Sequence, residues 1–187
     1  TRAPDGVIEG DNTDGIGLVR DLIANLGWAV QGLRVLLIGA GGAARGVLEP
    51  LLQECPQELL VVNRTGGRAA QLAMEFADVG PLEGGAYDLI GARQFDLVIN
   101  ATSAGLSGAM PELPGSLLTE RSCCYDMVYG SEPTPFMRWS AFHAAWAVAD
   151  GLGMLVEQAA ESFYIWRGVR PETSPVINEL RQVIAAA

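Results

Sequence analysis

The sequence VLLIGAGGAA, residues 35–44, is the most informative stretch of the chain, because an apolar strand candidate runs directly into a glycine-rich turn. A helical stretch near residues 43–53 follows. The turn has the spacing G-x-G-x-x-G/A, with Gly39, Gly41 and Ala44 at the three small positions. Gly39 permits the tight reversal, Gly41 lets the backbone approach a pyrophosphate, and Ala44 allows the helix to pack closely on the sheet. Since the free N–H groups of a helix N-terminus suit an anion, the turn predicts a dinucleotide site made by Gly39, Ala40, Gly41, Gly42 and Ala43.

The same rhythm of strand, turn and helix continues toward the C-terminus. Further apolar runs at residues 59–63, 96–100 and 123–128 have the length and composition of strands buried on both faces. Helix candidates lie near 67–77 and 114–120, whereas the glycine-rich region 79–94 predicts a loop with one short strand around 87–90. This alternation predicts an α/β fold, a doubly wound parallel sheet of the Rossmann type with right-handed crossovers.

Amphipathic helices are expected on both sides of this sheet region. Residues 14–26 carry an apolar stripe, with Asn12, Thr13 or Asp14 as capping candidates and Gly27 at the end. Two more helices are predicted at 152–166 and 174–187. Because a helix precedes the first clear strand, we expect the chain to be the latter part of a larger protein.

The residues after the second strand discriminate between the two nicotinamide dinucleotides. An NAD-binding protein usually carries an acidic residue there, about 20 residues beyond the glycine turn, to bind the ribose hydroxyls. This chain has Asn63, Arg64 and Thr65 instead, and Arg68 follows one helical turn later. Two guanidinium groups can bind one phosphate with charge-assisted hydrogen bonds, so the pattern favours NADP over NAD. The alternative is a pair of solvated surface arginines.

The composition argues against several classes of protein. With 22 acidic and 12 basic residues, the net charge of −10 disfavours nucleic-acid binding. No run approaches the roughly 18 apolar residues of a membrane span. The three cysteines fit neither a disulfide framework nor a zinc site, which favours a reducing cytoplasm. No metal-ligand spacing and no G-x-S-x-G motif is present, and His143, the only histidine, is interpreted as a helix-surface or capping residue. All basic residues are arginine, so the chain has no lysine.

Other polar residues follow the strands but have ordinary structural interpretations. Small polar residues including Thr102 follow the 96–100 strand, at the sheet edge that lines the ligand crevice of an open α/β sheet. Met127 and Tyr129 belong to the end of the next strand and would face the same crevice, but such residues are more often packing residues than ligands. Gln158 is typical of a core contact or a helix surface. Asp14 is, read locally, a helix cap.

Taken together, the motifs resemble one family, the NADP-dependent bacterial shikimate dehydrogenases. The resemblance lies in the ordered series GDNTDG (10–15), GAGGAA (39–44), NRT (63–65) with Arg68, NATS (100–103), YDM (125–127), TPF (134–136) and DGLGM (150–154). It spans nearly the whole chain and is weakest at 79–94 and after 167.

The resemblance implies an enzyme that reduces 3-dehydroshikimate to shikimate with NADPH. Asp14 matches the family's active-site aspartate, which binds a substrate hydroxyl and works with a lysine, while Tyr129 and Gln158 match residues that reach the substrate. The cofactor would be bound by Gly39, Ala40, Gly41, Gly42, Ala43, Asn63, Arg64, Thr65, Arg68, Thr102, Met127 and Gly151.

The resemblance also implies a domain division. Residues 1–13 would end a substrate-binding domain that carries the family's catalytic lysine, 14–173 would form the NADP-binding domain, and the 174–187 helix would pack toward the substrate domain. Without that lysine, we expect these 187 residues to bind NADP with little turnover. The exposed domain interface would favour self-association, including a homodimer.

Three alternatives stay open at this point. One is a quinate/shikimate dehydrogenase paralogue, and a second is a non-catalytic NADP-binding regulatory module. A third is a methyltransferase, which also has a glycine-rich first turn but requires an acidic residue in place of Asn63.

Overall fold

The computed structural model describes residues 10–104 and 109–186. Its described part contains a six-stranded, all-parallel sheet in the order β3-β2-β1-β4-β5-β6. The strands are β1 (Arg34–Ile38), β2 (Glu58–Val62), β3 (Leu82–Gly85), β4 (Phe95–Asn100), β5 (Leu118–Asp126) and β6 (Ala147–Asp150). The order reverses direction between β1 and β4, so the predicted doubly wound α/β fold is confirmed.

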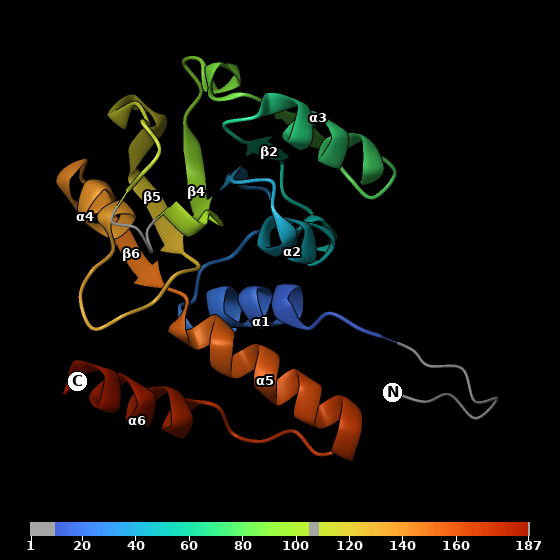
Figure 1. Ribbon diagram of the computed structural model, residues 1–187, viewed down its shortest axis with the longest axis vertical. Helices are drawn as coiled ribbons and strands as arrows, with labels where there is room; N and C mark the ends of the chain where they lie inside the picture. The colour runs from blue at the N-terminus through green and yellow to red at the C-terminus, as the bar shows by residue number, and fades with distance from the viewer. Residues whose placement is uncertain (1–9, 105–108, 187) are drawn as a thin grey trace.

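Helices cover both faces of this sheet (Figure 1). They are α1 (Asp14–Arg20), α2 (Gly42–Gln53), α3 (Gly66–Glu75), α4 (Pro135–Phe142), α5 (Leu152–Arg167) and α6 (Ser174–Ala185). Figure 1 shows α1 between α2 and α5, and α1 packs on both of them.

Alternation along the strands divides the core into two layers. On one face, Val35, Leu37 and Tyr125 pack with residues of α1, α2 and α5. On the other face, Leu36 and Ile38 pack with Phe136 of α4 and with two short 3-10 segments, η2 (Tyr87–Ile90) and η4 (Gly115–Leu117). Strands buried on both faces explain why their sequences are apolar runs without polar alternation.

The first helical segment is not a single α-helix. After α1 the chain continues as a π-helix, η1 (Asp21–Asn25), and ends at Gly27, whose φ is +69°. The wider turn places Asp21 against Tyr125 of β5, whose hydroxyl donates to Asp21 Oδ2 at 2.7 Å. Asn12, one of the three capping candidates, is the one that caps: its Oδ1 accepts the Asp14 N–H at 2.8 Å.

Two sequence predictions of secondary structure are wrong. The helix expected at 114–120 is only the turn η4, after which β5 begins at Leu118. The strand expected around 87–90 is the 3-10 segment η2, and the strand is β3, which contains two glycines. A Cβ on Gly84 would lie 2.1 Å from the Ala69 carbonyl oxygen, so close contact with α3, rather than strand propensity, explains the glycine.

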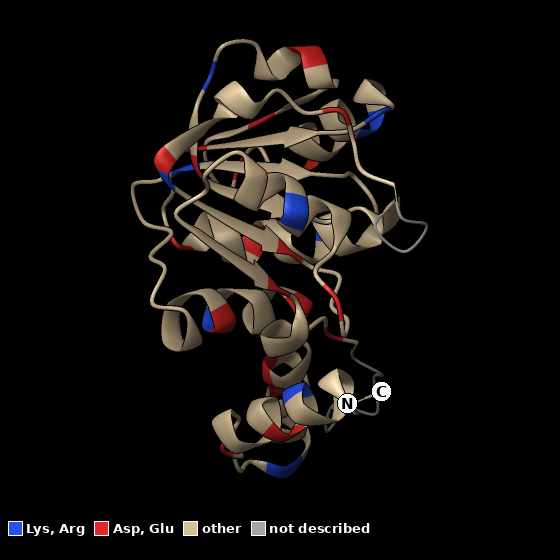
Figure 2. Cartoon of the chain, turned by 90° about the vertical axis from the view of Figure 1, so that its left-hand side faces the viewer, with Lys and Arg blue, Asp and Glu red and all other residues tan. Residues whose placement is uncertain are grey.

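Charged residues of both signs are distributed over the molecule (Figure 2). In that view the arginine positions are separated from one another, with acidic segments between them. No helix in the described ranges is both long and apolar enough to cross a membrane.

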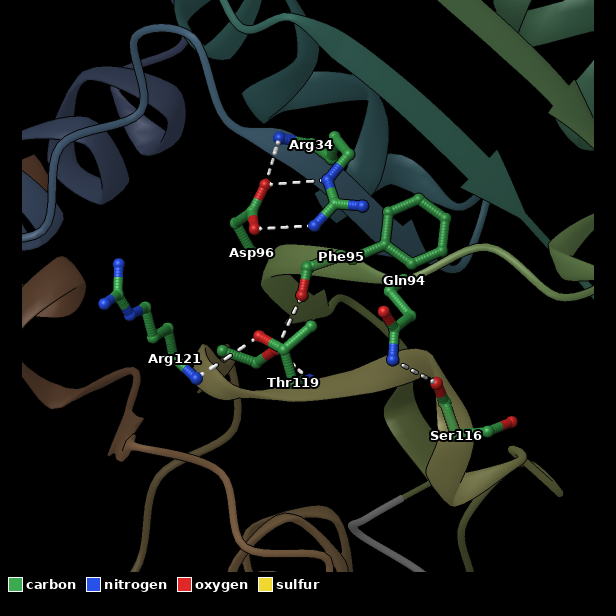
Figure 3. A network of polar contacts seen from close by, with 8 residues as sticks. Arg34, Gln94, Phe95, Asp96, Ser116, Thr119 and Arg121 are labelled. Carbon is green, nitrogen blue, oxygen red and sulfur yellow. Dashed lines mark hydrogen bonds and ion pairs between the residues drawn. The ribbon is translucent and has the colours of Figure 1, made fainter.

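The edge of the sheet away from the glycine turn is fixed by polar contacts (Figure 3). Asp96 accepts hydrogen bonds from the backbone N–H and the guanidinium of Arg34 at 2.9–3.0 Å. These contacts hold the pKa of Asp96 below its usual value. Here the β4–β5 register is irregular between Phe95 and Leu97, and the Ser122 hydroxyl donates to the Phe95 carbonyl at 2.6 Å. β5 starts at Leu118, which pairs with Phe95 before the irregularity, and its apolar run begins only at Cys123, which pairs with Leu97 after it.

The C-terminal helix α6 lies against α5 and contains no fully buried residue. Arg181 joins it to the sheet through two hydrogen bonds to Asp150, at 2.6 and 2.7 Å. Val176 and Val183 of α6 are exposed. The expected boundaries at 13/14 and 173/174 stay predictions.

Candidate functional site

The site lies at the carboxyl ends of the strands, beside the point where the strand order reverses. A groove of about 370 Å³ opens there. It is lined by Asp14, Ala43, Ala101, Thr102, Ser103, Met127, Val128, Tyr129, Gly151, Met154, Leu155 and Gln158. In an open α/β sheet this edge is where ligands bind. The structure therefore brings together, from α1, α2, α5 and three strand ends, seven residues that the sequence singled out.

The glycine turn leaves open space above its backbone. Gly39 has φ +111°, a conformation that favours glycine, and a Cβ there would lie 3.1 Å from the Ala101 carbonyl oxygen. At Gly41 and Gly42 a Cβ would meet no atom within 4 Å, and both residues are exposed at the start of α2. The free N–H groups of this twelve-residue helix face that space, so the turn fits a bound pyrophosphate.

A second groove of about 350 Å³ lies between α2 and α3, next to the glycine turn. It is lined by Ala40, Gly41, Gly42, Arg45, Arg68, Gln71, Leu72 and Glu75. Arg45 was not singled out from the sequence. It is paired with Glu75 and lies 5.6 Å from the Phe76 ring centre. The sequence feature that could have identified Arg45 is its position directly after Ala44, the last small residue of the turn.

The predicted phosphate clamp is exposed at the end of β2 and the start of α3. Asn63 Nδ2 donates to the Thr65 carbonyl at 3.1 Å, which shapes the turn. Within residues 10–104 and 109–186, the guanidinium groups of Arg64 and Arg68 have no ion pair, unlike those of Arg34, Arg45 and Arg181. Both are therefore free to bind an anion. Asn63, Arg64 and Thr65 line neither groove, and only Arg68 reaches the second one.

A buried carboxylate that sequence reasoning missed holds two of the site loops. Asp126, at the end of β5, is fully buried and accepts hydrogen bonds from Asn100 Nδ2, Thr134 Oγ1 and the Val128 N–H. Asn100 Oδ1 in turn accepts from the backbone and hydroxyl of Thr102. Burial raises the pKa of Asp126, while its hydrogen bonds lower it. This network fixes the loop that carries Thr102 and the loop that carries Met127 and Tyr129.

Gly151 explains how α5 can start beside the Met127 loop. A Cβ at Gly151 would lie 2.2 Å from the Met127 carbonyl oxygen, so a larger residue would displace one of the two segments. The preceding residue, Asp150, accepts the Leu152 N–H at 3.3 Å, which satisfies a backbone donor at the start of α5. Tyr129 is exposed at the mouth of the groove.

The two residues expected to reach the substrate lie on neighbouring helices. Asp14 begins α1 and is half-buried, and Gln158 lies in the second turn of α5. The N–H of Asp14 is held by Asn12, while its side chain lines the groove. The arrangement can hold a polar ligand between a carboxylate and an amide, next to the Met127 loop.

Asp21 of η1 is a second buried acidic residue, and it lies between η1, β5 and α5. Burial raises the pKa of Asp21, which accepts from Tyr125 and from Asn25, and Glu157 and Asp150 raise it further. In the described part of the chain, no cluster of three His, Cys, Asp or Glu residues could hold a metal ion. His143 is the C-cap residue of α4, in line with its interpretation from sequence.

Two family models match the chain. The model described as Shikimate / quinate 5-dehydrogenase matches residues 22–107, and the one described as Shikimate 5'-dehydrogenase C-terminal domain matches residues 151–181. Together they include the glycine turn, the phosphate clamp and the α5 residues of the groove.

The chain is also similar to curated relatives and solved structures. It is 52% identical to the shikimate dehydrogenase (NADP(+)) of Saccharophagus degradans over 95% of this chain, and 60% identical to that of Alkalilimnicola ehrlichii over 94%. It spans 66% and 65% of the lengths of these relatives. The structure of the Thermus thermophilus enzyme in complex with NADP(H) and shikimate is 34% identical, with a TM-score of 0.78 over 92% of this chain and 63% of that one.

These similarities confirm the resemblance inferred from the ordered motifs. The chain belongs to the shikimate dehydrogenase family.

Proposed function

We propose that this chain is the NADP-binding part of a shikimate dehydrogenase, which interconverts shikimate and 3-dehydroshikimate. The observation that carries the proposal is the single groove that joins Ala43 and Gly151, at the cofactor side, to Asp14 and Gln158, at the substrate side. Names of relatives at 52–60% identity support the same reaction and cofactor.

The chain's own residues would first bind and orient the dinucleotide. The N–H groups of Gly42 and Ala43 would bind the pyrophosphate, and Arg64 and Arg68 the adenosine 2′-phosphate. Thr102, Met127 and Gly151 would hold the nicotinamide end against the groove. When bound, NADP supplies the hydride chemistry.

Asp14 would then hold a hydroxyl of the substrate at the other side of the groove. As a carboxylate it also favours the charged form of a neighbouring ammonium group, so that a proton stays available. The chain has no lysine, so such an ammonium group would come from the rest of the protein. Tyr129 and Gln158 would complete the polar contacts to the ligand.

The segment of the relatives that this chain does not span could pack on exposed apolar residues of α5 and α6. The described chain exposes Trp166, Val176 and Val183 on α5 and α6, and we propose that a substrate-binding domain covers this face. We also propose a cytoplasmic location, which the three free cysteines support.

The cofactor half of this function is tested in the chain itself. Titration calorimetry with NADP and NAD should give the tighter binding to NADP. Equal affinities, or no binding of either, would contradict the proposal.

The proposed catalytic activity is tested in a longer protein, called here the completed protein. It consists of this chain joined to the segment that its relatives have and that this chain does not span. This protein should oxidise shikimate with NADP, whereas the chain alone should show little turnover. Robust activity of the 187 residues alone would contradict the proposal that the reaction needs the segment which this chain does not span. A higher kcat/KM for quinate would favour the quinate paralogue.

A further inference from the structure

The side-chain amide of Gln158 is fixed at both ends by other residues of the structure. Its Oε1 accepts a hydrogen bond from the Thr13 hydroxyl at 3.2 Å, and its Nε2 donates to the Leu155 carbonyl oxygen at 3.0 Å. Thr13 Oγ1 also lies 3.0 Å from Ser162 Oγ. Since the Thr13 proton is used on Gln158, Ser162 is the donor in that second contact.

The Thr13 hydroxyl is not needed as a helix cap. Thr13 occupies the N-cap position of α1, yet its side chain makes no capping hydrogen bond. Asn12 caps instead, through its contact with the Asp14 N–H. Thr13 is 8% exposed, and its hydroxyl points across to α5. A buried hydroxyl directed at a groove residue of another helix calls for a different explanation than capping.

Gly17 sets the distance over which this contact can form. A Cβ on Gly17 would lie 2.7 Å from both the Cβ and the N atom of Gln158. Gly17 therefore lets α1 lie against the backbone of α5 at this one residue, and the Gly17 N–H is itself bonded to the Thr13 carbonyl at 2.9 Å. Thr13 and Gly17, which are one helical turn apart, therefore both contact Gln158.

We infer that Thr13 is a positioning residue that orients the Gln158 amide toward the ligand groove, with Gly17 providing the close approach of α1 and α5. The inference rests on the proposed function, in which Gln158 touches the substrate and Thr13 does not. Thr13 is absent from the residues that line the groove, whereas Gln158 and Asp14 are both among them.

The two contacts also determine what the amide can offer. An amide has two N–H donors and two acceptor lone pairs, and one of each is used by Leu155 and Thr13. One N–H and one lone pair remain. The orientation is fixed as well, because a flipped amide would set its oxygen against the Leu155 carbonyl oxygen. Gln158 can therefore donate to one ligand oxygen and accept from one hydroxyl, which suits neighbouring hydroxyl groups on a ring.

The test is a double-mutant cycle in the completed protein. Thr13→Val keeps the shape and removes the hydroxyl, and it should raise KM for shikimate roughly fivefold while KM for NADP changes less than about twofold. Thr13→Ser restores the hydroxyl and should restore KM. In a Gln158→Ala background, Thr13→Val should add no further increase. Thr119→Val is the control, because it removes a half-buried threonine hydroxyl at the opposite end of the strands, far from the groove.

Several outcomes would overturn the inference. An unchanged KM in Thr13→Val would do so if Gln158→Ala raises KM, and so would an equal effect of Thr13→Val with and without Gln158. If Gln158→Ala itself leaves KM unchanged, or if the completed protein is inactive, the proposed function is wrong. A separate measurement then tests whether Thr13 orients the Gln158 amide.

That measurement is the NMR spectrum of the Gln158 side-chain amide in the 15N-labelled chain. The two amide protons should have well-separated shifts in the wild-type and Thr13→Ser chains, and should move toward free-amide values in Thr13→Val. Identical shifts in all three would overturn the inference whatever the activity. Should Thr13→Val not fold, Ser162→Ala provides the second route, since it removes the donor that fixes the Thr13 hydroxyl and should shift the same signals in the same direction.

Discussion

Arginines that look alike in the sequence differ in what they contact. Arg34, Arg45 and Arg181 are each paired with a carboxylate, whereas Arg64 and Arg68 are exposed and have no ion pair among the described residues. A guanidinium without a partner can bind a phosphate without first breaking an ion pair. This difference supports the proposal that Arg64 and Arg68 bind the 2′-phosphate.

Replacing both Arg64 and Arg68 by alanine should weaken NADP binding by about 100-fold, because two charge-assisted contacts are lost. NAD binding should change by less than about twofold, since NAD lacks the phosphate. Calorimetry on the chain measures both. The matched control is Arg121→Ala with Arg167→Ala, which removes the same charge from two exposed arginines outside the grooves. A parallel loss of NADP affinity in the control would mean that net charge alone is responsible.

Asp14→Asn should lower kcat of the completed protein by about 100-fold or more, because the amide cannot favour a neighbouring ammonium as a carboxylate does. Affinity for NADP should be retained, since the proposed function assigns Asp14, which lines the groove, to the substrate and not to the cofactor. Steady-state kinetics and calorimetry separate the two. Asp11→Asn, at an exposed position three residues earlier, is the control. An unchanged kcat in Asp14→Asn would contradict the proposed role of Asp14 in the reaction.

The buried Asp21 predicts a pH dependence of stability. Burial raises its pKa above the ordinary 3.8, so the carboxylate is disfavoured in the folded state. Its contribution to stability is therefore fully present below pH 3.8 and is lost as the pH rises through the folded-state pKa. Relative to Asp21→Asn, which stays neutral, the wild-type chain should lose stability between pH 4 and pH 7.

Urea unfolding of the two chains at both pH values measures this difference. A stability difference that is the same at pH 4 and pH 7 would mean that Asp21 titrates in the folded state as it does in the unfolded chain. Glu157 and Asp150, which face Asp21, are kept in both proteins.

At the scale of elements, glycines decide which helices can touch. Gly17→Ala should destabilise the chain by about 2 kcal/mol, because the new methyl group would overlap the backbone of Gln158. Gly67→Ala is the matched control in α3. A Cβ there meets no atom within 4 Å, so the change should stabilise the chain by about 0.5–1 kcal/mol through helix propensity. Thermal unfolding of both variants should shift in opposite directions, and equal shifts would contradict the packing argument.

The sequence predicted the elements whose residues are apolar for reasons of burial. Strands β1, β2 and β4 are apolar runs, as is the part of β5 from Cys123 to Tyr125, and α2, α3 and α5 follow strand ends or carry clear apolar faces. It did not predict β3, β6 or α4. Strand β3 is glycine-rich because it lies close to α3, and β6 is a four-residue strand of small residues whose structure depends on pairing with β5.

For the site, glycine spacing predicted the turn because its chemistry is local. The positions of Thr102, Met127, Tyr129, Gly151 and Gln158 came from resemblance, and the structure brings them to one groove, while their roles stay predictions. Asp126 was missed because a buried carboxylate that joins three chain segments has no local pattern. Thr13 was interpreted as a cap, because its partner Gln158 is distant in sequence.

In the molecule as a whole, the described residues leave large apolar side chains of α5 and α6 exposed. Trp166, Val176 and Val183 on α5 and α6 are 44–70% exposed. The chain alone should therefore self-associate as its concentration rises, and Val176→Ser with Val183→Ser should weaken this association by about tenfold. Sedimentation equilibrium measures it, with Val79→Ser as the control on a distant exposed valine. A chain that stays monomeric at high concentration would contradict this expectation.

One helix spans the distance between the two halves of the proposed chemistry. Because α5 has 16 residues, it is about 24 Å long. It starts at Gly151 against the Met127 carbonyl and ends in exposed aromatic residues. Between these ends it is held by α1, because Gly17 brings the two helices into close contact at Gln158. A substrate-binding domain that covers the exposed end, as proposed above, would therefore be joined to the Met127 loop by one continuous helix braced along its side.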